Sequence, residues 1–215
     1  MAFMKKKDQQ LQVVTFTSFN EGAGKTFVSA NLAVSLAMAK KKVVVVDLDI
    51  RKATLTSQFG GSHATGVTNF LYDTSLTVDD ILIKGVGYEN IDLIPAGSKA
   101  PNPSELLMDD RLDSLIAVLR ERYEYIIVDN VPVGIIADAT VSNRIADLTI
   151  FVVRAGKMDR RQLPELEELY QEKKLANMAI ILNGSERHSG GYGYGYGYGY
   201  GYGYGYGYGY GYGTE

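Results

Sequence analysis

Residues 17–26 read TSFNEGAGKT and stand between an apolar run, Val13–Thr17, and a stretch of helical pattern, Thr26–Ala39. A strand that enters a glycine-rich turn and continues into a helix leaves unpaired backbone N–H groups that converge on one point, which is what a phosphate chain requires. Lys25 supplies a cation, and Thr26 supplies a hydroxyl where Mg²⁺ would sit. The stretch therefore predicts a binding site for a nucleoside triphosphate.

The match to the phosphate-loop motif GxxxxGK[ST] is incomplete, because its first glycine position falls on Phe19. Gly22 and Gly24 still allow the backbone to approach a ligand closely. The alternative interpretation is a glycine-rich strand-to-helix turn that binds nothing. If the loop binds ATP, the residues expected to contact the nucleotide are Asn20, Glu21, Gly22, Ala23, Gly24, Lys25, Thr26 and Phe27.

Short apolar runs and helical stretches alternate along the chain, and most runs lack period-2 alternation, as expected for strands covered on both faces. The predicted strands are Val13–Thr17, Val43–Asp47, Ile91–Pro95, Tyr125–Asp129, Leu148–Val153 and Met178–Leu182. The predicted helices are Thr26–Ala39, Leu112–Arg122, Asp138–Ala146 and Leu163–Lys173, with a short one after Pro103. This order predicts an α/β fold, a mainly parallel sheet sandwiched by helices and similar to the P-loop NTPase fold.

Acidic residues follow two of the predicted strands, at the edge where parallel sheets bind their ligands. Asp47, Asp49 and Arg51 stand at the end of one strand, and Asp129 stands at the end of another. Carboxylates at the rim of an apolar core need a cation, and Mg²⁺ on nucleotide phosphates takes one or two carboxylates. Asp49 alone is equally consistent with a helix cap or a turn residue. Arg51 could serve phosphate, a neighbouring subunit or only Asp49.

Asn183 follows the last predicted strand and precedes Gly184. In related nucleotide-binding proteins an asparagine at this place contacts the adenine edge, whereas an Asn-Gly pair also forms turns without any ligand. Both interpretations stay open.

Composition limits the classes of partner. The net charge is −3, which favours neither nucleic acid nor an anionic membrane as a partner. The chain has no cysteine, which excludes disulfides, thiol chemistry and a cysteine-held iron–sulfur cluster. No apolar run approaches the roughly 20 residues of a membrane helix, and the start, MAFMKKK, lacks the apolar stretch of a signal peptide.

These motifs together resemble the bacterial tyrosine kinases (BY-kinases) that govern capsule and exopolysaccharide synthesis. The resemblance covers residues 10–188 and is carried by the strings SFNEGAGKT (18–26), VVVVDLDIR (43–51), DLIPAGSKAPNPSELL (92–107) and YIIVDNVP (125–132). A tyrosine-rich C-terminus adds to it. One departure is mild: the family often has two prolines after the aspartate of the last string, and here Val131 takes one place.

The resemblance implies an ATP- and Mg²⁺-dependent protein tyrosine kinase that phosphorylates its own tyrosines. It implies that Mg²⁺ is held by Thr26, Asp49 and Asp129, and that Asp47 lies nearest the accepting hydroxyl. Lys25, Asp47, Asp49 and Arg51 are then the expected catalytic residues. The implied domains are a P-loop kinase domain at 1–188 and a tail at 189–215.

The tail has tyrosine at every even position from 192 to 212, with glycine between, so that eleven of the sixteen tyrosines lie there. Alternating glycine makes ordering costly, and we expect the tail to be disordered. It could be the kinase's own substrate, a self-associating segment or an engineered tag. A phosphoryl-transfer site in the same chain favours the first. The expected phosphoacceptors are Tyr192, Tyr194, Tyr196, Tyr198, Tyr200, Tyr202, Tyr204, Tyr206, Tyr208, Tyr210 and Tyr212.

The alternative function is that of a ParA/MinD-like ATPase, an assembly switch with the Gly-Tyr tail as an interaction segment or tag. Those proteins resemble this chain but carry a second lysine early in the phosphate loop. Here that position is Asn20, which favours the kinase.

The resemblance also implies partners. These are neighbouring copies in a ring, a membrane activator that holds the kinase at the cytoplasmic face of the plasma membrane, and a tyrosine phosphatase. Residues 1–16 lack the family's E-x-x-R-x-x-R helix pattern, and no activator is present, so we expect this chain to be a fragment.

Overall fold

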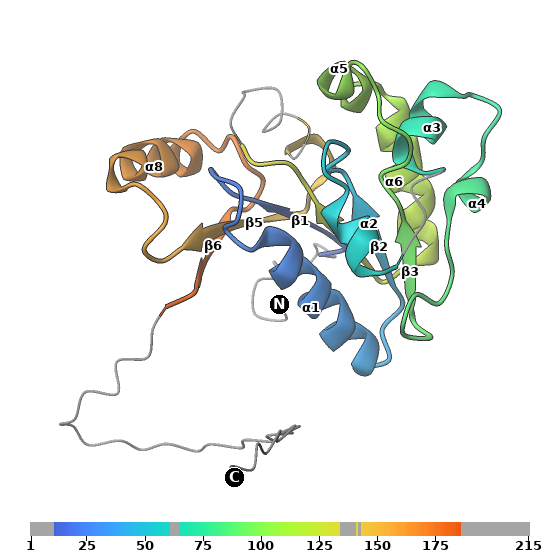
Figure 1. Cartoon of the computed structure of the whole chain (residues 1–215), viewed down its shortest axis with the longest axis horizontal. Coiled ribbons are helices and arrows are strands. Elements are labelled where there is room, and N and C mark those ends of the chain that lie inside the picture. Colours follow the sequence, from blue (N-terminus) through green and yellow to red (C-terminus); the bar gives the residue numbers. More distant parts are fainter. Residues whose placement is uncertain (1–10, 61–64, 134–140, 142, 186–215) are drawn as a thin grey trace, which may run out of the picture. The chain divides into compact units, whose positions relative to one another are not determined.

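The computed structural model describes residues 11–60, 65–133, 141 and 143–185. Within that part of the chain the strands form one six-stranded sheet in the order β3-β2-β4-β1-β5-β6, and all neighbouring strands are parallel (Figure 1). The strands are β1 (Val13–Thr17), β2 (Val43–Asp47), β3 (Ile91–Ile94), β4 (Tyr125–Asp129), β5 (Leu148–Arg154) and β6 (Ala179–Asn183). The predicted mainly parallel α/β sheet is confirmed.

The helices include both predicted and unpredicted segments. They are α1 (Lys25–Met38), α2 (Thr54–Gln58), α3 (Val67–Tyr72), α4 (Val78–Ile81), α5 (Pro103–Leu107), α6 (Arg111–Arg122) and α8 (Leu163–Gln171). Of the predicted helix at 138–146, residues 138–140 and 142 lie outside the described residues, whereas 141 and 143–145 are helical. No helix among the described residues has the length and apolar character needed to span a bilayer.

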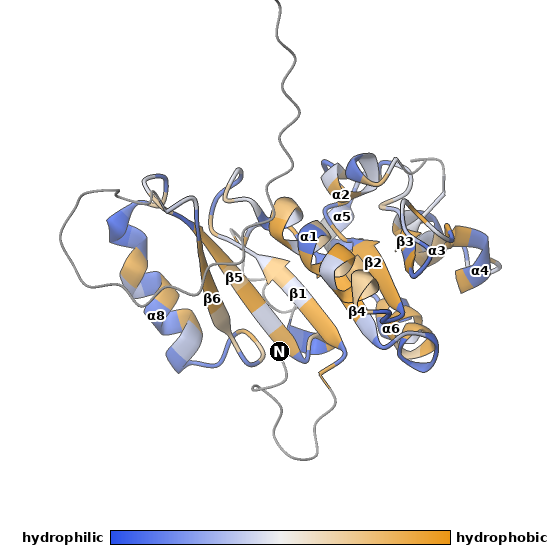
Figure 2. Ribbon diagram, turned by 90° about the horizontal axis from the view of Figure 1, so that it is seen from below, coloured by the Kyte–Doolittle hydropathy of each residue, from blue (hydrophilic) through white to orange (hydrophobic). Residues whose placement is uncertain are grey.

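Helices cover both faces of the sheet. On one face α1 packs three alanines, Ala30, Ala33 and Ala37, against buried residues of β1, β2, β4 and β5. On the other face α6 packs Leu112 and Leu115 against the alternate residues of β1, β2 and β4. Each central strand is therefore buried on both sides, which explains its continuous apolar run (Figure 2).

A smaller apolar cluster lies where α8 meets β5. Leu166 and Leu169 of α8 pack with Phe151 of β5 and with Phe19, the residue in the irregular motif position. The Phe19 and Phe151 rings meet edge to face with centroids 4.8 Å apart. The side chain that replaces the usual glycine therefore anchors the loop to the core.

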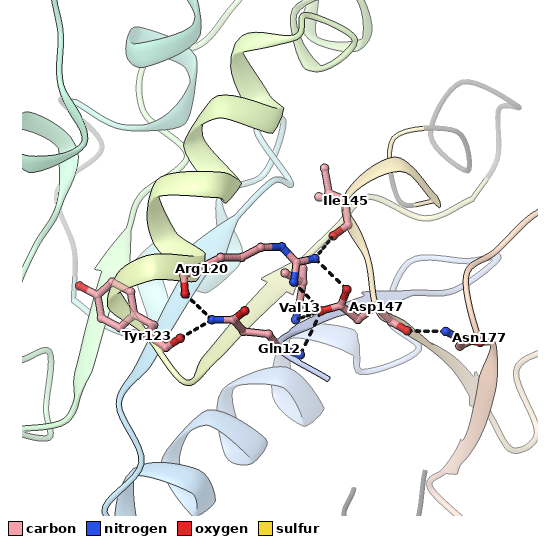
Figure 3. Close-up of polar contacts among 7 residues, drawn as sticks. All are labelled: Gln12, Val13, Arg120, Tyr123, Ile145, Asp147 and Asn177. Carbon is pink, nitrogen blue, oxygen red and sulfur yellow. Dashed lines mark hydrogen bonds and ion pairs between the residues drawn. The ribbon is translucent and has the colours of Figure 1, made fainter. Parts of the chain in front are cut away.

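A polar cluster joins the amino ends of β1 and β5 to the end of α6 (Figure 3). The Asp147 carboxylate accepts the backbone N–H groups of Gln12 and Val13 at 3.0 and 2.8 Å and both guanidinium nitrogens of Arg120 at 2.8 Å. Gln12 Nε2 donates to the carbonyls of Arg120 and Tyr123, at 2.6 Å each. Burial raises the pKa of Asp147, but the Arg120 and N–H hydrogen bonds outweigh it and hold that pKa below its usual value. The cluster fixes the sheet edge opposite the carboxyl ends of the strands.

The predicted domain boundary between residues 188 and 189, and the whole tail at 189–215, lie outside the described residues.

Candidate active site

The phosphate loop connects β1 to α1 through left-handed backbone positions at Gly22 (φ 72°) and Gly24 (φ 97°). Gly24 is the residue that precedes α1, and within the part of the chain that the structure describes no side chain caps the first N–H groups of that helix. The first turn of α1 contains no acidic residue. The helix therefore begins with unpaired donors and the positive end of its dipole directed at the loop, an arrangement that favours anions.

Asn183, at the end of β6, reaches this loop. Its Nδ2 donates to the Ala23 carbonyl at 2.9 Å. A Cβ added to Gly24 would lie 2.2 Å from the same nitrogen, so the position next to Asn183 has no room for a side chain. Asn183 also precedes Gly184, which has φ 69°. The side chain thus ties β6 to the phosphate loop, and a turn follows it, whereas contact of Asn183 with an adenine edge stays a prediction.

Thr26 and Asp129 meet where the loop faces the end of β4. The Thr26 hydroxyl donates to Asp129 Oδ2 at 2.5 Å. Lys25 is only 7% exposed, and burial lowers its pKa, although the charges of Asp129 and Asp49 partly offset that effect. A lysine cation and two carboxylates therefore share one partly buried site at the start of α1.

The environment of Asp129 fits a cation. This side chain is 1% exposed, and its Oδ1 is the buried side-chain atom without a hydrogen-bond partner among the described residues. Burial raises the pKa of Asp129 to about 7, an effect that the Thr26 hydrogen bond only partly offsets and the Asp47 charge increases. No three His, Cys, Asp or Glu side chains of the described ranges converge on one point as metal ligands do. An orphaned carboxylate oxygen beside a threonine hydroxyl suits Mg²⁺, which uses few protein ligands and completes its shell with phosphates and water.

Asp47 is the register partner of Asp129 across β2 and β4 and is fully buried. Its Oδ2 accepts the Thr56 N–H at 2.8 Å and the Thr56 hydroxyl at 2.7 Å, and its Oδ1 accepts the Asp49 N–H at 3.1 Å. Burial raises the pKa of Asp47 to about 6, although the hydrogen bonds from Thr56 oppose the rise. A carboxylate with this pKa can both accept and release a proton near neutral pH.

Asp49 and Arg51 lie in the turn between β2 and α2. Asp49 is 9% exposed, and its Oδ1 accepts the Lys52 N–H at 3.2 Å, as a turn residue would. Arg51 is exposed in the same turn. The Lys52 ammonium forms an ion pair with Glu21 of the phosphate loop, and the hydrogen bond from Lys52 lowers the pKa of Glu21. This pair joins the turn to the loop across the front of the site.

The remaining predicted residues lie at the margin of the site or outside the described residues. Phe27 is 63% exposed on α1, and Asn20 donates from Nδ2 to Gln162 Oε1 at 3.1 Å. The predicted phosphoacceptor tyrosines lie outside the described residues. Sequence reasoning missed Thr56 and Lys52. Lys52 adjoins the acidic motif and could have been included with it, whereas nothing in the local sequence marks Thr56.

The fold and this site define a nucleotide-binding P-loop protein, and comparison with known proteins agrees. The family described as an AAA domain matches residues 11–179, and the chain belongs to it.

Within that class the chain belongs to the bacterial tyrosine-protein kinases. It is 31% identical to tyrosine-protein kinase CpsD of Streptococcus pneumoniae serotype 4 over 81% of this chain and 76% of that protein. It is 32% identical to YwqD of Bacillus subtilis, over 85% of this chain and 77% of that kinase. The solved kinase domain of the Escherichia coli tyrosine kinase ETK superposes with a TM-score of 0.77 at 31% identity, covering 91% of this chain and 75% of that one. The expected family and fold are confirmed.

The likeness to the septum site-determining protein MinD of Pyrococcus horikoshii, with 24% identity and a TM-score of 0.64, extends to the fold alone. The alternative of a ParA/MinD-like switch therefore gains no support beyond the shared architecture.

Proposed function

We propose that this chain is an ATP- and Mg²⁺-dependent tyrosine autokinase that phosphorylates tyrosines 192–212 of a neighbouring copy and so regulates capsular or exopolysaccharide synthesis. One observation carries the proposal: an uncapped helix N-terminus and two buried, paired aspartates meet at one sheet edge. The chain also contains eleven evenly spaced acceptor tyrosines. A simple nucleotide switch gives no reason for so many acceptors.

The loop residues hold the triphosphate in this proposal. The free N–H groups at the start of α1 and the Lys25 ammonium contact the β- and γ-phosphates. Thr26, Asp49 and Asp129 hold Mg²⁺, and Asn183 and Phe27 lie on the side of the nucleoside. Mg²⁺ held by these residues would supply positive charge beside the transferred phosphoryl group. A role as a Mg²⁺ ligand best explains why the Asp129 carboxylate is buried, because its Oδ1 would then gain the partner that it otherwise lacks.

Asp47 receives the proton of the accepting tyrosine. A tyrosine hydroxyl is protonated at neutral pH. As the bond between its oxygen and the γ-phosphorus forms and the bond to the ADP oxygen breaks, the proton passes to Asp47 Oδ1 and later to water. That oxygen accepts one hydrogen bond, from the Asp49 N–H, and a carboxylate oxygen can accept two. Thr56 positions Asp47 by holding the other oxygen.

Transfer takes place between copies. The 27 residues of the tail span roughly 5–6 Å × √27, or about 30 Å, which is enough to reach a neighbouring molecule. The wider setting that we propose is the one the family resemblance implies: a homo-oligomer at the cytoplasmic face of the membrane, an activator that brings it there, and a phosphatase that resets the tyrosines. Arg51, exposed beside the site, serves the phosphates or the neighbouring copy.

A mixing experiment tests the proposal. A Lys25→Met chain, inactive but with an intact tail, is incubated with Mg²⁺-ATP and an active chain whose eleven tail tyrosines are phenylalanine. We expect phosphotyrosine on the Lys25→Met chain, at a rate that rises with protein concentration. A Lys99→Met chain is the control for the lysine-to-methionine substitution and should still donate phosphate, because Lys99 is exposed and lies outside the site. Failure of any combination to label the inactive chain, while full-length active chain labels itself independently of dilution, contradicts transfer between copies.

A further inference from the structure

A second lysine lies beside the phosphate loop. Lys52 stands in the turn between β2 and α2, and its ammonium forms an ion pair with the Glu21 carboxylate of the loop. Both side chains are more than half exposed, at 52% and 66%. Ion pairs as exposed as this one add little to stability, because water screens both charges. Stability therefore gives little reason for a link between this turn and the loop.

The Lys52 ammonium lies within electrostatic reach of Lys25. Burial has the largest effect on the pKa of Lys25 and lowers it. The charge of Glu21 raises that pKa, whereas the charge of Lys52 lowers it further. The hydrogen bond from Lys52 lowers the pKa of Glu21, and the charge of Lys25 acts in the same direction. Glu21 thus interacts with two cations, the lysine of the phosphate-loop motif and a lysine of the neighbouring turn.

The turn fixes the backbone of Lys52 but leaves its side chain room to move. The Lys52 N–H donates to the carbonyl and to Oδ1 of Asp49, at 3.1 and 3.2 Å. The next residue, Ala53, has a left-handed φ of 49°, and its N–H donates to the same carbonyl at 2.7 Å. The backbone is therefore held closely around Asp49. The ammonium stands at the end of a flexible four-carbon stem and can exchange one anionic partner for another.

The order of the strands places Lys52 on one particular side of the loop. The loop follows β1, and Asn183 reaches it from β6, whereas the Lys52 turn follows β2, on the other side of β1 in the sheet. In the proposed function the nucleoside lies toward Asn183, and the accepting hydroxyl lies toward Asp47 at the end of β2. Lys52 is therefore on the side of the terminal phosphate rather than on that of the nucleoside.

We propose that Lys52 is a second phosphate-binding lysine, which exchanges Glu21 for the terminal phosphate when ATP binds. The inference rests on the proposed function, whose site it extends. A triphosphate carries more negative charge than one carboxylate and attracts the ammonium more strongly. Before nucleotide binds, Glu21 holds the ammonium, and its own charge opposes any anion that approaches the loop. Lys52 thus favours ATP over ADP, whereas Glu21 weakens the binding of both.

A merely structural link between the turn and the loop leads to a different expectation. Loss of either partner then loosens the same contact, so that substitutions of Lys52 and of Glu21 weaken the binding of ATP and ADP alike. In our proposal the two substitutions change affinity in opposite directions, and only the substitution of Lys52 alters the preference for ATP.

Isothermal titration calorimetry on the full chain, with Mg²⁺ and at one ionic strength, tests this role. The probes are ADP and the β,γ-imido analogue of ATP, which does not transfer its terminal phosphate. Lys52→Met should bind the analogue about tenfold more weakly than the wild type does, because a charge-assisted contact is lost, and ADP less than about twofold more weakly. Glu21→Gln should bind the analogue about threefold more tightly, because a repelling charge is removed.

The matched control is Lys41→Met. It breaks an ion pair of similar exposure, between Lys41 and Glu124, which stand just before β2 and β4 at the opposite edge of the sheet. This variant should bind both nucleotides as the wild type does.

An equal loss of affinity for both nucleotides in Lys52→Met, or no loss, overturns the proposal. Glu21→Gln that binds the analogue no more tightly than the wild type does also overturns it. Either result, obtained with a wild type that binds nucleotide, leaves the proposed kinase function standing. A wild type that binds neither nucleotide contradicts the proposed function itself, and the role of Lys52 with it.

Discussion

Replacing Asp129 by asparagine should stabilise the ligand-free protein at alkaline pH, although the residue belongs to the proposed metal site. Burial raises the pKa of Asp129 to about 7 from an ordinary value of 3.8. At about 1.4 kcal/mol per pKa unit, this difference of about 3 units costs about 4 kcal/mol once the carboxylate is ionised. The asparagine amide nitrogen must also be desolvated, at about 1–2 kcal/mol. The net gain in the free energy of unfolding is about 2–3 kcal/mol at pH 8.

The gain should depend on pH in a definite direction. The folded-state pKa of Asp129 lies above its unfolded value, so its contribution to stability is fully present below about pH 4. It is lost as pH rises through about 7. Asparagine does not titrate, and its side-chain oxygen can still accept the Thr26 hydroxyl. The difference between variant and wild type should therefore grow from near zero or slightly negative at pH 4.5 to its full value at pH 8.

Urea unfolding at pH 4.5, 6 and 8, without metal or nucleotide, measures this. Glu89→Gln is the matched control, because it makes the same chemical change at an exposed side chain outside the site. A variant at Asp129 that is less stable than wild type at pH 8, or a difference that does not grow with pH, refutes the reasoning. Mg²⁺-ADP should then stabilise the wild type more than Asp129→Asn.

Three further changes probe other parts of the account. Asp147→Ala removes the acceptor of four hydrogen bonds and should lower the free energy of unfolding by about 2–4 kcal/mol in urea; a loss below about 0.5 kcal/mol would contradict the role of the polar cluster. Gly97→Ala forces a side chain into φ 86° with its Cβ 2.5 Å from Asn69 Oδ1, so thermal unfolding should show a loss of about 1–3 kcal/mol, and an unchanged Tm would count against it. Thr56→Val removes the hydroxyl hydrogen bond to Asp47 Oδ2 and leaves the backbone N–H bond to that oxygen, and tyrosine phosphorylation should slow at least tenfold while circular dichroism stays that of the wild type; full activity would exclude the positioning role of the hydroxyl.

The strands could be predicted from the sequence because burial on both faces leaves a simple local signal. β1, β2 and β4 begin and end at the predicted residues, β3 and β5 differ by one residue at their C-terminal ends, and β6 is shifted by one residue at both ends. The short helices α2, α3 and α4 were not predicted. They have four to six residues, too few for a period of 3.6 to appear in a sequence, and α2 follows Ala53 with its unusual φ of 49°.

The candidate site could be predicted in outline for a geometric reason. Parallel strands end at one edge, so the aspartates that end β2 and β4 had to lie near the phosphate loop, and Asp47 and Asp129 are in fact register partners. Contacts that form only where the chain folds back on an earlier segment could not be predicted from the sequence. Thr56 reaches Asp47 only because α2 folds back over β2, and Asn183 reaches Ala23 across 160 residues of sequence.

The central claim is that this chain transfers phosphate from ATP to its own tyrosines, and intact mass spectrometry tests it most directly. The full chain is incubated at high concentration with Mg²⁺-ATP, alongside the Lys25→Met chain. The account predicts a series of species separated by the mass of one phosphate, with the modified residues among tyrosines 192–212, and no such series from Lys25→Met. A mass that stays unchanged while inorganic phosphate accumulates would contradict it, because the chain would then be an ATPase rather than a tyrosine kinase.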